Sequence, residues 1–95
     1  MAMYPISVPR KLYSGGKASK KQEAADHNRL AGELQKHINA KVNEREEEEQ
    51  TYLYYEIANE MGYDPETVRK ILYGVDGGHH GLTVTKPKGA FPLSD

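Results

Sequence analysis

The residues best suited to molecular recognition lie in the segment 64–73. If this segment is a helix, its apolar residues Val68, Ile71 and Leu72 point inward. The side chains that remain outward are Asp64, Pro65, Glu66, Thr67, Arg69, Lys70 and Tyr73. An exposed helix face that carries cations, a carboxylate and a hydroxyl has the groups that read the edges of DNA bases.

Each of these groups suits a particular partner on double-stranded DNA. Arg69 can form a bidentate pair with guanine, and Glu66 can accept a hydrogen bond from cytosine. Thr67 can meet a thymine methyl group or a phosphate, and Lys70 is better suited to a phosphate. The alternative is that both cations form surface pairs with Glu66 and its neighbours, which contribute little to stability.

Other candidate chemistry in the chain is weak. His79 and His80 are adjacent, so their side chains point apart in an extended segment, and Asp76 is the one carboxylate nearby in sequence. The chain has no cysteine, so a tetrahedral metal site would lack its usual ligands. His27 and His37 fall on different sides of a helix. No nucleophile is placed beside a base, so we expect no catalytic residue and do not expect an enzyme. We also expect no cofactor and no metal.

Lysines outside segment 64–73 are candidates for contacts with DNA phosphates. Residues 1–22 carry five basic side chains and no acidic one. Basic arms lie along the phosphate backbone in some DNA-binding proteins. We therefore expect phosphate contacts from Lys17, Lys20, Lys21 and Lys86. A solvated, unstructured leader is the alternative for the N-terminal lysines.

The elements that must position these groups are mainly helical. From Ala18 onward the composition favours a helix, and an apolar residue recurs every four positions at Leu30, Leu34, Ile38 and Val42. This stripe predicts an amphipathic helix of roughly twenty residues. Asn43 is expected to break or cap this helix, and the next helix is expected to begin between Glu46 and Thr51.

Residues 54–73 have the spacing of two short helices that cross through a tight turn. Ala58 gives the small residue needed where the helices touch, and four residues later Gly62 can end the first helix in a left-handed conformation. Asp64 suits an N-cap and Pro65 the first helical position. The second helix is then expected to run to about Tyr73.

The segment from Glu56 to Leu72 resembles the helix-turn-helix superfamily of DNA-binding proteins, in particular bacterial or phage regulators. The resemblance covers about twenty of the 95 residues and does not identify a particular family. Tyr63 is bulkier than the aliphatic residue usual at its position. The resemblance implies that the second helix enters the major groove and that the protein binds specific DNA sequences as a small transcriptional regulator.

Both ends of the chain differ from this helical domain, which we assign to residues 18–74. Residues 1–17 form a basic arm or a short strand, with residues 6–8 extended between two prolines. Residues 75–95 comprise a glycine-rich loop, a short strand at 82–86 and a tail. Pairing of 6–8 with 82–86 would give a two-stranded wing or brace. Gly74 is expected to end the last helix.

The bulk composition is that of one small domain. The mean hydropathy is -0.82 and the net charge is -1, and we find no apolar run long enough to span a membrane and no signal peptide, so we expect a cytoplasmic protein. The predicted fold is mainly α, with three helices and a minor two-stranded β element. Useful DNA affinity would call for a homodimer or a protein partner, through the first helix or through Tyr52, Tyr54 and Tyr55. The neutral charge and the acidic run Glu46–Glu49 support an alternative, a helical protein-protein interaction adaptor.

Overall fold

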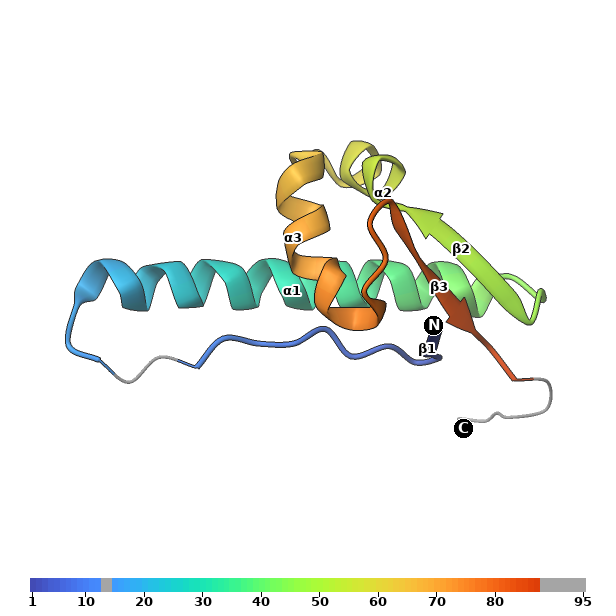
Figure 1. The fold of residues 1–95 in the computed structure, drawn as a ribbon, viewed down its shortest axis with the longest axis horizontal. Helices are drawn as coiled ribbons and strands as arrows, with labels where there is room; N and C mark the ends of the chain where they lie inside the picture. Colours follow the sequence, from blue (N-terminus) through green and yellow to red (C-terminus); the bar gives the residue numbers. More distant parts are fainter. Residues whose placement is uncertain (13–14, 88–95) are drawn as a thin grey trace.

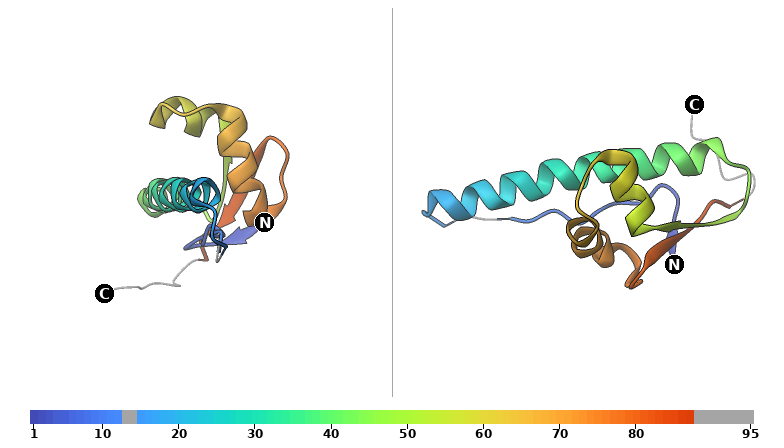
Figure 2. Two further views of the ribbon diagram at one scale, coloured as in Figure 1. Left: turned by 90° about the vertical axis from the view of Figure 1, so that its left-hand side faces the viewer. Right: turned by 90° about the horizontal axis from the view of Figure 1, so that it is seen from above.

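One long helix runs the length of the molecule, and a small sheet and two short helices lie on one side of it (Figures 1 and 2). The structure, a computed structural model, describes residues 1–12 and 15–87. In chain order its elements are β1 (Ala2–Met3), α1 (Ala18–Glu44), β2 (Glu49–Leu53), α2 (Tyr54–Met61), α3 (Pro65–Asp76) and β3 (Gly81–Thr85). The prediction of a mainly α fold with a minor β element is confirmed. No helix within the described ranges has the length and apolar character needed to cross a membrane.

The apolar stripe of α1 forms the centre of the core. Ala31, Leu34, Ile38 and Val42 are completely buried, whereas Leu30 is half-buried. The helix is 27 residues long, which exceeds the predicted length, and Asn43 lies inside it. The core therefore confirms the predicted stripe, although the break or cap expected at Asn43 was wrong, since α1 ends at Glu44 and Arg45 is its C-cap.

The N-terminal segment 4–12, hereafter the strap, leaves the sheet after Tyr4, whose N–H donates to Thr85 O at 2.8 Å, and then runs along α1 (Figure 1). Ile6 N–H donates to Asn39 Oδ1 at 2.8 Å, and Val8 N–H donates to Gln35 Oε1 at 2.9 Å. Both Ile6 and Val8 are buried. Because these backbone groups bond to helix side chains, the strap needs no strand partner. The predicted pairing of residues 6–8 with 82–86 was therefore wrong.

The sheet has three strands, in the order β1-β3-β2. β3 pairs antiparallel with β2, with Gln50 opposite Val84, and parallel with the two residues of β1. Alternate residues of β2 and β3 face the core, since Tyr52, Leu82 and Val84 are buried with Gln50. The strand expected at 82–86 is confirmed at 81–85, but the helix expected to begin between Glu46 and Thr51 begins at Tyr54, because 49–53 pair as β2. Tail residues 88–95 lie outside the described part.

Side chains of β2 and of the residue that follows β3 cap the C-terminal end of α1. Lys86 Nζ donates to the carbonyl oxygens of Asn43 and Arg45 at 2.9 and 2.8 Å, and more weakly to that of Val42 at 3.4 Å. The amide of buried Gln50 also donates to Val42 O at 3.2 Å. The last carbonyls of a helix lack partners within it and carry a partial negative charge. An ammonium group and an amide here therefore stabilise the end of α1.

The last helix is longer than the sequence predicted. α3 continues to Asp76, and Gly77, with a φ of 76°, forms its C-terminal cap in place of Gly74. Gly74 lies inside α3, where a Cβ atom would come within 3.3 Å of Pro9 Cγ in the strap. The small residue therefore allows the strap to pass close to the helix, and the expectation that Gly74 ends the helix was wrong.

An ion-pair cluster holds α2 against α1. Glu60 Oε1 of α2 lies 2.8 Å from His37 Nε2, and Glu60 Oε2 lies 3.0 Å from Lys41 Nζ. The hydrogen bond with His37, followed by that with Lys41, lowers the pKa of the Glu60 carboxyl below its ordinary value. The ionised form of Glu60 is therefore favoured in the folded protein.

We expect the Lys86→Met substitution to destabilise the fold by about 1–2 kcal/mol, because the carbonyls at the end of α1 lose a charged donor while the aliphatic stem is kept. Urea denaturation followed by circular dichroism measures this change. Lys36→Met is the matched control, since Lys36 is exposed on α1. Equal stability of the two variants would contradict the capping role.

We expect the Glu60→Gln substitution to reduce stability at pH 7 by no more than about 1 kcal/mol, since the cluster is partly exposed. Because the pKa of Glu60 is lower in the folded protein, the carboxylate contributes fully to the free energy of unfolding above its ordinary pKa of 4.5. This contribution is lost as the pH falls through the pKa of Glu60 in the folded protein. The gap between wild type and variant should therefore close in acid. Denaturation curves from pH 7 to pH 3 test this, with Glu56→Gln as control; a gap of constant size would rule out the linkage.

Candidate nucleic-acid interface

The turn between α2 and α3 sets the direction of α3. Gly62 ends α2 with a φ of 77°, a left-handed conformation that favours glycine. Tyr63 N–H donates to Ala58 O at 2.8 Å, and the Asp64 side chain accepts from Thr67 N–H at 3.2 Å as the N-cap of α3. Pro65 occupies the first turn. The predicted cap, N-cap and proline position are therefore all confirmed.

The inward and outward faces of α3 are those expected from the sequence. Val68, Ile71 and Leu72 are buried, as are Ile57 and Ala58 on α2. The outward set is exposed along the helix apart from half-buried Arg69: Asp64, Pro65, Glu66, Thr67, Lys70 and Tyr73. The structure thus brings the seven predicted residues together on one helix, which forms a ridge between two recesses.

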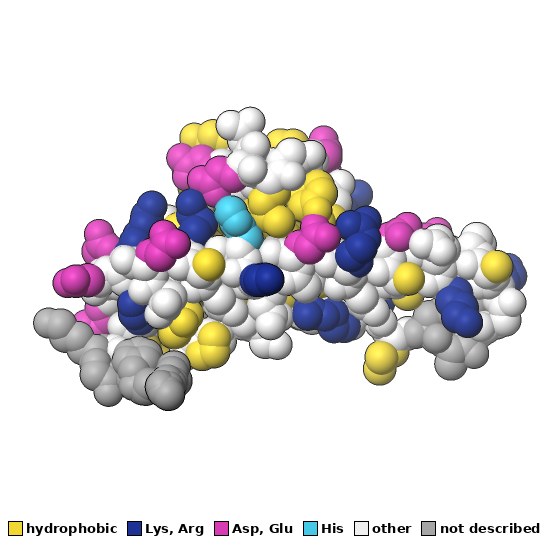
Figure 3. Space-filling model, turned by 180° about the vertical axis from the view of Figure 1, so that it is seen from behind, with side chains coloured by type: hydrophobic (Ala, Val, Ile, Leu, Met, Phe, Trp, Pro, Cys, Tyr) yellow, Lys and Arg dark blue, Asp and Glu magenta, His cyan; other side chains and the backbone are white. Residues whose placement is uncertain are grey.

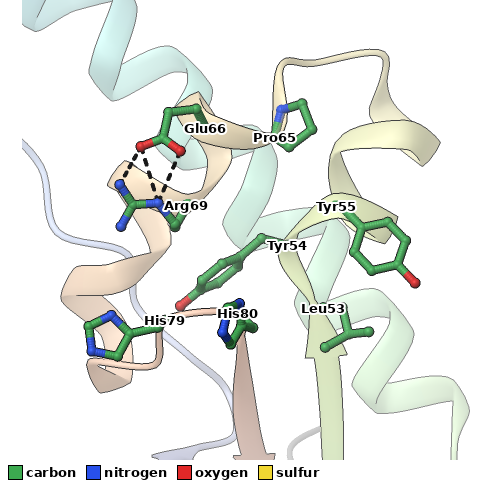
Figure 4. Close-up of a pocket in the computed structure, with 8 residues that line it drawn as sticks. All are labelled: Leu53, Tyr54, Tyr55, Pro65, Glu66, Arg69, His79 and His80. Atoms are coloured by element: carbon green, nitrogen blue, oxygen red, sulfur yellow. Dashed lines mark hydrogen bonds and ion pairs between the residues drawn. The ribbon is translucent and has the colours of Figure 1, made fainter.

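The first recess, hereafter the tyrosine–histidine recess, has a volume of about 370 Å³. Figure 4 shows the residues that line it, which are Leu53, Tyr54, Tyr55, Pro65, Glu66, Arg69, His79 and His80. The Tyr54 ring points toward the loop with the two histidines, and its hydroxyl donates to Gly78 O at 2.6 Å. Burial raises the pKa of the Tyr54 hydroxyl. Tyr54 therefore acts as a neutral donor that holds the loop beside α3.

Arg69 reaches this recess already paired with Glu66. Its Nε lies 3.1 Å from Glu66 Oε2, and its Nη2 also bonds to that oxygen (Figure 4). The guanidinium lowers the pKa of the Glu66 carboxyl. The surface pair considered as an alternative is therefore present for Arg69, and reading a base with Arg69 would require exchange of this partner.

The second recess lies on the other flank of α3 and is hereafter called the cationic recess. Its volume is about 390 Å³. It is lined by Lys11, Asp26, His27, Arg29, Leu30, Thr67, Lys70 and Ile71. Sequence reasoning placed Thr67 and Lys70 here on α3 but missed Lys11 and Arg29, because nothing in the linear sequence shows that the strap and α1 meet beside α3.

The other residues predicted to contact phosphates lie farther from α3. Lys17, Lys20 and Lys21 lie around the N-terminal end of α1, which extends beyond α3 in Figure 1. Lys86 instead caps the far end of α1 through three carbonyl oxygens. We therefore leave Lys86 out of the candidate interface.

The tyrosine cluster and the acidic run have different surroundings from those expected. Tyr52 and Tyr54 are buried, and Tyr55 is 59% exposed, so of these three only Tyr55 offers a contact surface. The run Glu46–Glu49 is exposed in the connection from α1 and at the start of β2. It does not lie at the N-terminus of α2, where it would have faced a bound DNA backbone.

Metal-ligating side chains do not converge in the described ranges, where no group of three could hold a metal ion. His79 packs against the Tyr73 ring, with the ring centroids 5.6 Å apart.

On the face seen from behind, acidic and basic side chains are interspersed without a patch of one sign (Figure 3). Of the two recesses beside α3, the cationic recess is lined by three cations, Lys11, Arg29 and Lys70, and the tyrosine–histidine recess by one, Arg69.

The geometry of α3 and its two recesses is the basis on which a function can be assigned. Comparisons with protein-family models, with curated proteins and with solved structures found no match to this chain.

Proposed function

We propose that the chain binds double-stranded DNA through the outward face of α3, as a small sequence-specific regulator of transcription. The observation that carries the proposal is the unit formed by α2, the turn at Gly62 and α3, in which α3 stands as an exposed ridge. An α-helix with its side chains is about 10–12 Å wide, and the major groove of B-DNA is about 12 Å wide. The two recesses leave room for the sugar–phosphate strands on either side of such a helix.

Within this proposal the α3 side chains have separate roles. Thr67 and Glu66 lie in the first turns of α3, which meet base edges when a helix enters the groove by its N-terminal part. Arg69 reads guanine after leaving Glu66, and that carboxylate is then free to accept from cytosine. Lys70 lies on the flank that faces a phosphate strand. The exchange of Glu66 between Arg69 and a base would make binding depend on the base sequence.

The oligomeric state belongs to the same proposal. A single module of this size contacts few base pairs, and regulators of this kind commonly gain affinity as dimers. We therefore propose that the chain binds DNA as a homodimer, without the tyrosine cluster as its interface, because Tyr52 and Tyr54 are buried.

A protein-binding adaptor is the second candidate function. One observation favours it: the tyrosine–histidine recess is lined by Tyr55, which is 59% exposed, and the 44% exposed Tyr73 packs against His79 of its lining. Exposed tyrosines beside a recess are common at protein interfaces. The net charge of -1 is also lower than non-specific DNA binding would favour. The two functions differ in their dependence on salt and on Lys70.

We expect salt-sensitive binding of mixed duplex DNA fragments, measured by fluorescence anisotropy in low and in moderate salt. Lys70→Ala should reduce the slope of log K against log salt by about 0.9, because one phosphate contact is lost. Arg69→Ala should weaken binding of a selected sequence by about 10-fold or more, because it removes a base contact.

Lys36→Ala is the matched control, since it removes one charge from an exposed position of α1 away from α3. It should bind as the wild type does. Absence of binding even in low salt would contradict the DNA-binding proposal, and the recess around Tyr55 would become the place to seek a protein partner.

A further inference from the structure

We infer that the cationic recess, together with its continuation along α1, is the seat of one sugar–phosphate strand of DNA. This inference rests on the proposed function, because it assumes that α3 occupies the adjacent groove. It assigns phosphate contacts to Lys11 and Arg29, which the sequence did not single out, and it excludes Lys86 from that role.

The charge of the cationic recess comes from three separate segments of the chain. Lys11 belongs to the strap, Arg29 to α1 and Lys70 to α3, so the fold has to be complete before the cations meet. Within the described part of the chain, Arg29 Nη1 pairs with Glu33 Oε2 at 3.3 Å, whereas neither Lys11 nor Lys70 forms an ion pair, so the uncompensated positive charge is that of the two lysines. Asp26 is the one carboxylate in the lining, and it accepts from Gln22 Nε2 at 2.9 Å. The recess therefore has an excess of positive charge that a phosphate strand would neutralise.

Lys11 is positioned by its backbone rather than by its charge. Its N–H donates to Asn28 Oδ1 at 2.7 Å, and its carbonyl accepts from Asn28 Nδ2 at 2.9 Å. His27 Nε2 lies 3.3 Å from Pro9 O two residues earlier in the strap. These contacts fix the strap against α1 while the Lys11 ammonium stays exposed. A cation held in this way loses little backbone freedom when an anion binds.

The positive charge continues from this recess toward the N-terminus of α1. Lys11 also lines a smaller hollow of about 250 Å³ with Leu12, Lys20, Glu23 and Ala24. Lys20 lines the smaller hollow and His27 the cationic recess. They are seven positions apart on one side of α1, or about 10 Å along its axis. Phosphates of one strand follow one another about every 3.4 Å along a duplex. The track from Lys70 through Lys11 to Lys20 is thus long enough for several successive phosphates.

The inference is tested by the salt dependence of duplex DNA binding with Lys11→Ala, Asn28→Ala and the control Lys36→Ala. Lys11→Ala should lower the slope of log K against log salt by about 0.9, and the control should leave the slope unchanged. Asn28→Ala keeps the charge but releases the strap, so it should weaken binding as well. Circular dichroism and thermal melting verify that each variant remains folded.

The outcomes separate this inference from the function on which it rests. If the wild type binds, Lys70→Ala weakens binding and Lys11→Ala equals the control, the phosphate seat is overturned while the function stands. If the wild type binds no duplex in low salt, both are overturned. If Lys11→Ala lowers the slope of log K against log salt and Lys36→Ala leaves it unchanged, the assignment of a phosphate strand to the cationic recess is supported.

Discussion

The burial of one apolar stripe on α1 is the constraint on which the rest of the molecule depends. Ala31, Leu34, Ile38 and Val42 are fully buried, and the sheet, α2, α3 and the strap together cover them. A two-helix unit and a three-stranded sheet of this size would not bury their own apolar faces alone. The polar contacts of α1, with the strap along its length and with Lys86 at its end, hold the strap and the end of β3 in place.

The arrangement of the candidate interface follows from this packing. α3 directs Val68 and Leu72 into the shared core and leaves its opposite face without a covering element in the described ranges. The strap passes close to α3 because Gly74 has no side chain, and it carries Lys11 to the same flank as Lys70. The backbone contacts that complete the core thus also bring together the cations of the cationic recess.

Local sequence signals predicted local features well and long-range pairings poorly. The helical stripe of α1 and the Gly62, Asp64 and Pro65 signals each depend on neighbours within a few residues, and the structure confirms them. β2 was missed because residues 49–53 become a strand only when β3 pairs with them. The strap was misassigned because its partners are amides on α1. Asn28, Gln35 and Asn39 do recur on one side of that helix, a signal that could have suggested a polar partner.

Backbone amide chemical shifts measured during titration with duplex DNA would test most directly whether α3 is a DNA-reading helix. The proposal predicts that the largest shifts fall on the outward residues Glu66, Arg69 and Lys70, with a second group at Lys11 and Arg29, and that added salt reverses them. Shifts confined to surfaces remote from α3, such as the run Glu46–Glu49, would contradict it, as would a spectrum that DNA leaves unchanged.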